Sequence, residues 1–220
     1  MTEITFRSDC RVTYIYHRGD DKRIAQAARV STGSDQSDRP HEGLVKRLWR
    51  DQHTSTFEHN TLTVMVEVPI FVAREWMRSR TFAYNEISAR YSEMEPVFYV
   101  PGEDRPLVQT GKAMDYRREA GSEEQWADAH WGHDSVAAVS WSHYQQMLAS
   151  GIAREVARNV LPVSLYTRFY ATANLRNWLH FIKLRTDPTA LHEIQDAARQ
   201  VADLIQEKWP TAWAAYEETQ

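Results

Sequence analysis

Residues 61–91 read TLTVMVEVPIFVAREWMRSRTFAYNEISARY: a strand pattern, a proline, a helix pattern and a polar segment in succession. In residues 61–68 every second side chain is leucine or valine, which predicts a strand with one buried face. Pro69 ends that strand and begins a helix, because proline suits the first turn of a helix. The rest of the chain is interpreted outward from this strand, helix and loop.

The polar part of this stretch, residues 74–91, is a candidate anion site. Arg74 and Arg78 stand at helical i, i+4 spacing with Glu75 beside them, and Ser88 and Arg90 follow. Guanidinium groups bind phosphate through two parallel hydrogen bonds, and a hydroxyl with backbone N–H groups completes such a site. The competing interpretation is a solvated, charged helix end, which is typical of most charge runs.

Periodicity on either side predicts one α+β domain over residues 1–220, with no repeat and no linker. Polar residues 34–40 and a Pro- and Gly-rich stretch to about Gly111 are expected to be loops. Strands are expected at residues 11–16, 61–68, 97–100 and 164–173. Helices are expected at residues 20–31, 43–52, 122–150, 152–160, 174–185 and 189–209.

Composition limits the possible functions. The chain has 220 residues and a net charge of -4, which disfavours a general nucleic-acid-binding protein. No apolar run reaches the roughly 20 residues that span a bilayer, and the N-terminus lacks a signal-peptide pattern, so a cytoplasmic protein without membrane contact is expected. Cys10 is the only cysteine. It excludes an intrachain disulfide and a cysteine-based zinc site, and it is expected to be a small packed residue.

Two further sets of polar residues have a structural and a functional interpretation. His53 and His59 resemble metal ligands, but the HExxH spacing is absent, and no metal is predicted. Arg158 precedes a proline-terminated helix end, where an arginine is often simply on the surface. Another polar stripe is either solvated or covers the phosphates and pyrimidine edge of a flat ligand: Asn174, Arg176, His180 and Arg185. Rossmann, P-loop and serine-hydrolase motifs have no counterpart in the sequence.

Residues 78–91, RSRTFAYNEISARY, resemble the signature RHRxxSxNExSxRY of the flavin-dependent thymidylate synthases. The similarity extends in the family's order over most of the chain. It includes AARVS (27–31), HTSTFEH (53–59), PIFVAREW (69–76), AREVARNVLP (153–162), SLYTRFYATANLR (164–176) and HFIKLR (180–185).

The resemblance implies a central antiparallel sheet with long flanking helices, and a homotetramer whose active sites are shared between chains. It implies FAD as cofactor, methylene-tetrahydrofolate as one-carbon donor and NADPH as reductant. The nucleotide, a deoxypyrimidine monophosphate, would be held by Glu86, Ser88, Arg90 and Arg158, with Glu75 and Arg78 from a neighbouring chain. Arg185 would act at the pyrimidine edge as the catalytic residue. FAD would contact Ser31, His53, Ser55, Arg78, Ser79, Arg80, Asn174, Arg176 and His180.

The chain departs from the signature at two positions, where Ser79 replaces histidine and Ala83 replaces serine. Glu75 stands where the family often has glutamine. Two reactions are therefore considered. In the first, dUMP becomes dTMP when a hydride reduces the transferred carbon. In the second, water captures the methylene group and yields a hydroxymethyl pyrimidine from dUMP or dCMP, because altered contacts expose the site to water.

Overall fold

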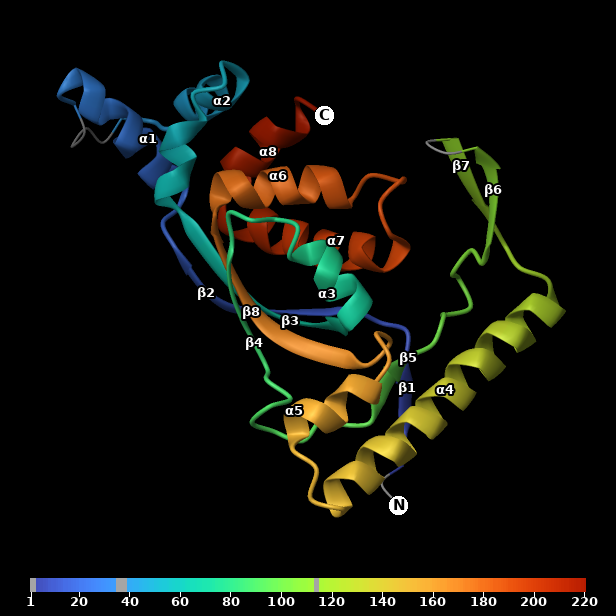
Figure 1. Ribbon diagram of the computed structural model, residues 1–220. Coiled ribbons are helices and arrows are strands. Elements are labelled where there is room, and N and C mark those ends of the chain that lie inside the picture. The colour runs from blue at the N-terminus through green and yellow to red at the C-terminus, as the bar shows by residue number, and fades with distance from the viewer. Residues whose placement is uncertain (1–2, 35–38, 113–114) are drawn as a thin grey trace. The chain divides into compact units, whose positions relative to one another are not determined.

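A computed structural model describes residues 3–34, 39–112 and 115–220, and it contains both helices and strands, as expected (Figure 1). The loop predicted at residues 34–40 includes residues 35–38, which lie outside the described residues. The described strands are β1 (Thr5–Arg7), β2 (Arg11–Arg18), β3 (Thr61–Pro69), β4 (Ala83–Glu86), β5 (Val97–Tyr99), β6 (Val108–Lys112), β7 (Asp115–Glu119) and β8 (Tyr166–Asn174).

The helices include a single long one, α4, drawn in yellow in Figure 1, and several shorter ones. The described α-helices are α1 (Asp21–Arg29), α2 (Glu42–Arg50), α3 (Ile70–Trp76), α4 (Glu123–Ala149), α5 (Arg154–Ala157), α6 (Leu175–Arg185), α7 (His192–Lys208) and α8 (Pro210–Glu217). Short 3-10 helices are η1 (Val30–Thr32), η2 (Thr54–His59) and η3 (Arg158–Val160). No described helix has the length and apolar character needed to cross a membrane.

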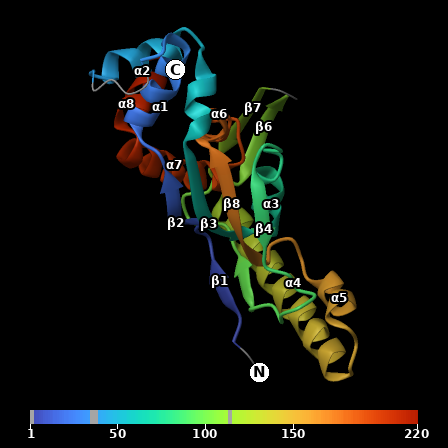
Figure 2. The ribbon, with the colours of Figure 1, turned by 90° about the vertical axis from the view of Figure 1, so that its left-hand side faces the viewer.

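The main sheet has four strands in the order β2-β3-β8-β4, which lie side by side in Figure 2. Leu175 N donates to Asn60 O at 2.9 Å, just before β3 begins and just after β8 ends. Ile70 N donates to Leu165 O at 2.9 Å, at the opposite ends of the same two strands. Strands β3 and β8 therefore run in opposite directions, and the expected antiparallel sheet is confirmed.

Strand β3 confirms the alternation seen in the sequence. Leu62, Val64, Val66 and Val68 are fully buried, whereas the side chains between them are partly exposed. Burial of each such aliphatic side chain contributes about 1.5–3 kcal/mol, so the buried face fixes the register of this strand. Helix α3 begins directly after Pro69, as predicted.

Helix α3 is shorter than the sequence suggested. It ends at Trp76, so the helical pairing of Arg74 with Arg78 was wrong. Residues 83–86, expected to be irregular, form β4 at the edge of the sheet. An edge strand needs only backbone pairing on one side, so its polar and largely exposed side chains carry no alternating pattern.

The Pro- and Gly-rich loop predicted to reach about Gly111 is also wrong in part. Strands β6 and β7 form an antiparallel hairpin in which Val108 lies opposite Glu119 and Thr110 opposite Arg117. Most of the hairpin's described side chains are exposed. A hairpin without a buried face has no apolar periodicity in its sequence, so the alternation of side chains does not predict it.

Helix α8 follows a proline that was expected only to end the preceding helix. Pro210 occupies its first turn, and the carboxylate of Asp21 accepts hydrogen bonds from Thr211 N at 2.8 Å and from Ala212 N at 3.0 Å. The buried Asp21 thus satisfies two N–H groups that a helix N-terminus leaves without partners. A cap supplied from α1 cannot be recognised from the local sequence.

The described chain divides into two compact units. Unit 1 comprises residues 1–10, 67–76 and 86–169, and unit 2 comprises residues 11–66, 77–85 and 170–220. The boundary between Asn85 and Glu86 falls inside the signature segment. A single domain over residues 1–220 stays a prediction.

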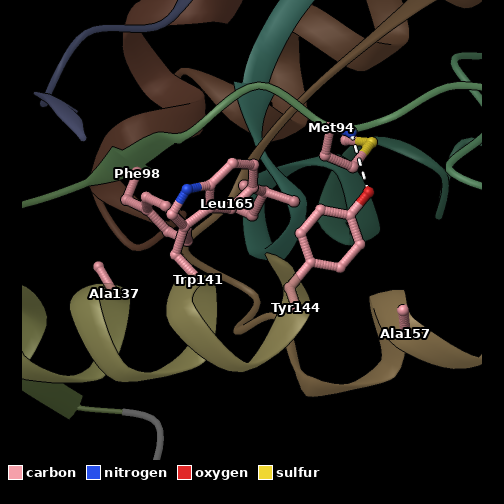
Figure 3. Close-up of a cluster of buried hydrophobic side chains, with 7 residues drawn as sticks. All are labelled: Met94, Phe98, Ala137, Trp141, Tyr144, Ala157 and Leu165. Carbon is pink, nitrogen blue, oxygen red and sulfur yellow. Dashed lines mark hydrogen bonds between the residues drawn. The ribbon is translucent and has the colours of Figure 1, made fainter. Parts of the chain in front are cut away.

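Unit 1 is built around one face of α4, as Figure 3 shows. Trp141 and Tyr144 of that helix pack with Phe98 and Leu165, and Tyr144 Oη accepts a hydrogen bond from Met94 N at 3.2 Å. The predicted long helix at residues 122–150 is confirmed. Other apolar side chains of α4 are exposed, among them Trp131, Val136 and Val139. Cys10 is buried, as expected.

Unit 2 has its own core, centred on α6 and α7. The predicted inward positions of α6 and α7 are buried, among them Leu179, Ile182, Val201 and Ile205. The ring of Phe82 lies 4.4 Å from that of Trp178 in an edge-to-face arrangement, measured between ring centroids. Phe82 therefore anchors residues 77–82, which carry part of the signature, to α6.

Candidate functional site

Unit 1 contains a cavity of about 430 Å³. Its polar lining residues come from segments far apart in the sequence: α3, the end of β4, η3 and the start of β8. Ile70, Arg74, Glu86, Ile87, Ala89, Met94, Arg158, Asn159, Leu161, Val163, Leu165 and Thr167 form the lining. A cavity that combines apolar side chains with converging polar groups is suited to a small molecule with both apolar and charged parts.

The carboxylate of Glu86 is held at the wall of this cavity. Thr167 donates its hydroxyl hydrogen to Glu86 Oε1 at 2.6 Å, and Ile87 N donates to Arg168 O at 2.9 Å. Both the side chain of Glu86 and the backbone after it are thus tied to β8 or its start. The geometry presents a fixed acceptor group to the cavity.

Two guanidinium groups, from Arg74 and Arg158, give the cavity positive charge. Arg158 is the first residue of η3 and is half-buried, and Arg74 lies on α3. Neither forms an ion pair with another of the described residues. Guanidinium groups with free donors near an apolar wall suit a phosphate monoester.

The predicted phosphate-binding set is only partly brought together. Glu86 and Arg158 line the cavity, but Ser88 and Arg90 are outside its lining. Ser88 Oγ accepts from Arg90 N at 3.3 Å, and the Arg90 guanidinium pairs with Glu155 of α5 at 3.1 Å. Arg90 is exposed, and a ligand anion would compete with an ion pair that is worth little in water.

A second ion pair joins the same two segments. Arg154 of α5 lies 3.3 Å from Glu93, and it complements the pair between Arg90 and Glu155. In one pair the arginine belongs to residues 90–93, and in the other it belongs to α5. The two segments therefore have complementary charges that favour one register. The segment η3, which carries Arg158, continues directly from α5.

The remaining nucleotide candidates lie elsewhere. Glu75 is on α3 in unit 1 and is half-buried, and Arg78 lies beyond that helix in unit 2 and is exposed. Arg185 is the last residue of α6, also in unit 2. None of these three is among the residues that line the cavity.

Candidate flavin residues occur on neighbouring elements of unit 2. Helix α6 packs against η2, and Arg176 Nη1 in its first turn pairs with Glu58 of η2 at 2.6 Å. Asn174 caps α6 by accepting from Asn177 N at 2.9 Å. Ser31 Oγ donates to Ala28 O. His53, Ser55 and His180 are exposed on the same unit.

The segment Arg78–Arg80 has two exposed arginines on either side of the half-buried Ser79. Tyr84 Oη donates to Ser79 O at 3.0 Å. Burial raises the pKa of Tyr84 well above its ordinary value, whereas the hydrogen bond to Ser79 and the positive charge of Arg185 act to lower it. Tyr84 therefore keeps its proton at neutral pH and remains the donor to Ser79, with Arg185 nearby.

No group of three or more His, Cys, Asp or Glu side chains within residues 3–34, 39–112 and 115–220 is arranged to hold a metal ion. The two histidines considered as metal ligands are both exposed. His53 precedes η2, and His59 is its last residue.

Two polar lining residues were not assigned to the site from the sequence: Asn159 and Thr167. Arg74 was part of the candidate anion site at residues 74–91, although the family resemblance gave it no role. Thr167 lies in a strand of Tyr, Phe and Thr residues, which indicates only a strand. Its role depends on which strand pairs beside β8, and only the structure gives that.

Comparison with known proteins finds similar chains. Residues 13–211 match the family model Thy1, described as thymidylate synthase complementing protein. A flavin-dependent thymidylate synthase of Streptomyces avermitilis is 42% identical over 218 residues, covering 96% of this chain and 88% of the relative.

Solved structures of a UMP/dUMP methylase, PolB, from Streptomyces cacaoi are also similar. With 5-Br UMP bound, PolB superimposes with a TM-score of 0.90 at 40% identity, covering 97% of this chain and 96% of the other. With 5-Br dUMP bound, the TM-score is 0.91 at 38% identity, with coverages of 98% and 97%.

Proposed function

The chain belongs to the flavin-dependent thymidylate synthase family. We propose that it transfers a one-carbon unit from methylene-tetrahydrofolate to C5 of dUMP. The product is dTMP, and FADH2 and NADPH supply the reduction. The observation that carries the proposal is the cavity of unit 1, in which Arg74 and Arg158 face the same space as the fixed carboxylate of Glu86. The two cations complement a phosphate, and the carboxylate accepts from an N–H or hydroxyl donor of the nucleotide.

The exposed side chains of unit 2 are chemically suited to FAD. The guanidinium groups of Arg78, Arg80 and Arg176 complement a diphosphate, and His53 and His180 offer flat rings and hydrogen-bonding nitrogens. We assign Ser31, Ser55, Ser79 and Asn174 to the same surface. When bound, FAD supplies the hydride that reduces the transferred carbon.

Activation of the pyrimidine is assigned to Arg185. C5 of uracil is a weak nucleophile, and a guanidinium at the N3/O4 edge stabilises the negative charge that develops as C5 attacks. The only cysteine, Cys10, is buried in unit 1 and is in none of the signature segments, so attack of a thiolate on C6 has no candidate in this chain. Ser88 and Arg90, with Glu75 and Arg78 of neighbouring chains, would complete the nucleotide contacts.

We also propose the homotetramer with shared active sites. Its support is an apolar surface on α4, where Trp131 is 74% exposed, Val136 52% and Val139 59%. Large exposed apolar side chains gathered on one helix are typical of contact surfaces between chains.

Light scattering of the purified protein is expected to give the mass of four chains, and Val139→Asp is expected to reduce it, because a buried carboxylate would oppose association. A monomer at micromolar concentration would contradict the tetramer. Lys183→Ala, an exposed change on α6, serves as a control that should keep the mass.

Ser79 and Ala83 favour a second reaction, in which the product is a hydroxymethyl pyrimidine. Serine and alanine at these positions fill less space than the histidine and serine of the family signature, so water has better access to the reacting carbon. Water would then capture the methylene group and produce a hydroxymethyl pyrimidine from dUMP or dCMP. UMP is included as a rival substrate, because the similar protein PolB is a UMP/dUMP methylase.

The deciding experiment incubates FAD-loaded protein with methylene-tetrahydrofolate and dUMP, dCMP or UMP, with and without NADPH, and measures product mass. We expect a methyl product from dUMP that requires NADPH. A hydroxymethyl product formed without net use of reductant would replace thymidylate synthesis by the second reaction. No product and no binding of any of the three nucleotides would reject both.

A further inference from the structure

Thr167 is the most constrained polar group in the cavity wall. Its side chain is 4% exposed, and its hydroxyl lies 2.6 Å from Glu86 Oε1. The hydroxyl must be the donor, because a carboxylate only accepts. A donor bound to a charged acceptor forms one of the stronger hydrogen bonds in proteins, so this contact fixes the orientation of an otherwise exposed carboxylate.

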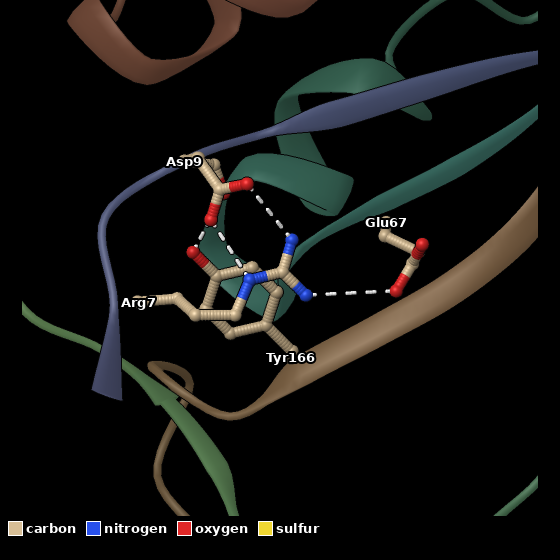
Figure 4. Close-up of polar contacts among 4 residues, drawn as sticks. All are labelled: Arg7, Asp9, Glu67 and Tyr166. Carbon is tan, nitrogen blue, oxygen red and sulfur yellow. Dashed lines mark hydrogen bonds and ion pairs between the residues drawn. The ribbon is translucent and has the colours of Figure 1, made fainter. Parts of the chain in front are cut away.

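The start of β8 is itself held in place, as Figure 4 shows. Tyr166 Oη donates to Asp9 O at 2.7 Å, and the Arg7 guanidinium lies 4.7 Å from the centroid of the Tyr166 ring. Arg7 also pairs with Asp9 at 2.8 Å and with Glu67 at 3.6 Å. The residue before Thr167 therefore has little freedom to move.

The backbone provides a second restraint on Glu86. Its neighbour Ile87 donates to Arg168 O at 2.9 Å, directly after Thr167 in the chain. One bond fixes the backbone and the other fixes the carboxylate. Without the hydroxyl, the backbone bond would remain and the carboxylate of Glu86 would be free to rotate among its rotamers.

We propose that Thr167 is a positioning residue for the nucleotide site: by occupying Glu86 Oε1 it presents Oε2 to the cavity as an acceptor for a sugar hydroxyl of the nucleotide. This inference rests on the proposed function, since it names how that site recognises its substrate. A pre-oriented acceptor gives tighter binding because less rotamer entropy is lost when the ligand arrives.

The test compares Thr167→Val with Thr167→Ser in the full chain loaded with FAD. Valine keeps the branched shape and removes the donor, whereas serine keeps the donor. We expect Thr167→Val to weaken dUMP binding in calorimetry about tenfold and to raise KM by a similar factor with little change in kcat, and we expect Thr167→Ser to stay close to wild type. FAD absorbance and affinity should be unchanged, because the flavin candidates lie in unit 2.

Two controls separate positioning from general damage to the fold. Thr172→Val makes the same change on the same strand, at a hydroxyl that lies 2.8 Å from the Thr63 hydroxyl and outside the cavity lining, and it should leave dUMP affinity near wild type. In a double-mutant cycle, Thr167→Val should cost much less affinity when Glu86→Gln is already present, because both changes remove one interaction.

The outcomes are distinguishable. If the wild-type protein does not bind dUMP, the proposed function fails and this inference fails with it. If the wild type binds and Thr167→Val binds equally well, or if the two changes are additive, only the positioning role is overturned. Equal losses in Thr167→Val and Thr167→Ser, or a parallel loss of FAD, would also overturn it.

Discussion

Arg158→Gln is expected to weaken dUMP binding about a hundredfold, because a charge-assisted contact with phosphate in a partly buried site contributes about 2–3 kcal/mol. The Arg158 side chain is half-buried, lines the cavity and forms no ion pair within the described chain, so its full charge is available to a ligand. Glutamine is shorter and uncharged, although its amide can still donate a hydrogen bond. The expected loss therefore reports the charge and the reach of the guanidinium together, and calorimetric titration with dUMP measures it.

Arg154→Gln provides a matched control. Arg154 lies on the same short segment, is exposed and pairs with Glu93, but it does not line the cavity. Exposed ion pairs contribute little, so we expect a change in dUMP affinity within about threefold. An equal loss in both variants would mean that general charge, rather than the position of Arg158, attracts the nucleotide. If Arg158→Gln binds dUMP as tightly as the wild type, the assignment of Arg158 to the phosphate is wrong.

The fold was predictable wherever one face of an element is buried against the rest of the chain. The alternation of β3, the proline before α3 and the apolar faces of α6 and α7 are all confirmed. The missed elements include β4, the hairpin β6–β7 and α8. The first two are stabilised by backbone pairing with few buried side chains, and α8 depends on a cap from Asp21, so local periodicity carried no signal for them.

The family resemblance named candidate nucleotide residues, but it did not indicate which of them line one cavity. Glu86 and Arg158 share a cavity, whereas Arg90 is paired with Glu155 and Ser88 accepts from the Arg90 backbone. Sequence spacing cannot show that Thr167, far along the chain, donates to Glu86. That contact exists because β8 lies next to β4 in the sheet.

The division of the signature at Asn85 and Glu86 separates two sets of candidate residues. Those from Glu86 onward belong to unit 1 with the nucleotide cavity, and Arg78–Arg80 belong to unit 2 with the flavin candidates. Because Ser79 is assigned only to FAD and Glu86 only to the nucleotide, we expect changes at Ser79 to alter the reaction outcome more than dUMP affinity, and changes at Glu86 to do the reverse. The departures from the signature, Ser79 and Ala83, both lie in the unit 2 part.

Arg185→Ala is expected to lower turnover about a hundred- to a thousandfold while FAD absorbance stays unchanged, because removing a group that stabilises developing charge typically costs this much. Arg185 ends α6, beside Tyr84, whose hydroxyl holds the Ser79 carbonyl. Steady-state product formation and the flavin spectrum measure the two quantities on the same sample.

Two other variants at the C-terminal end of α6 show whether the loss comes from the position, the charge or the shape of the Arg185 side chain. Lys183→Ala removes an exposed cation from the last turn of α6 and should retain wild-type turnover, because it has no assigned contact with substrate. Arg185→Lys keeps the positive charge but lacks the planar fork that matches the N3/O4 edge, so we expect only partial recovery. Turnover that survives in Arg185→Ala would show that another group activates C5. Full recovery with lysine would show that charge alone is sufficient, without the bidentate geometry.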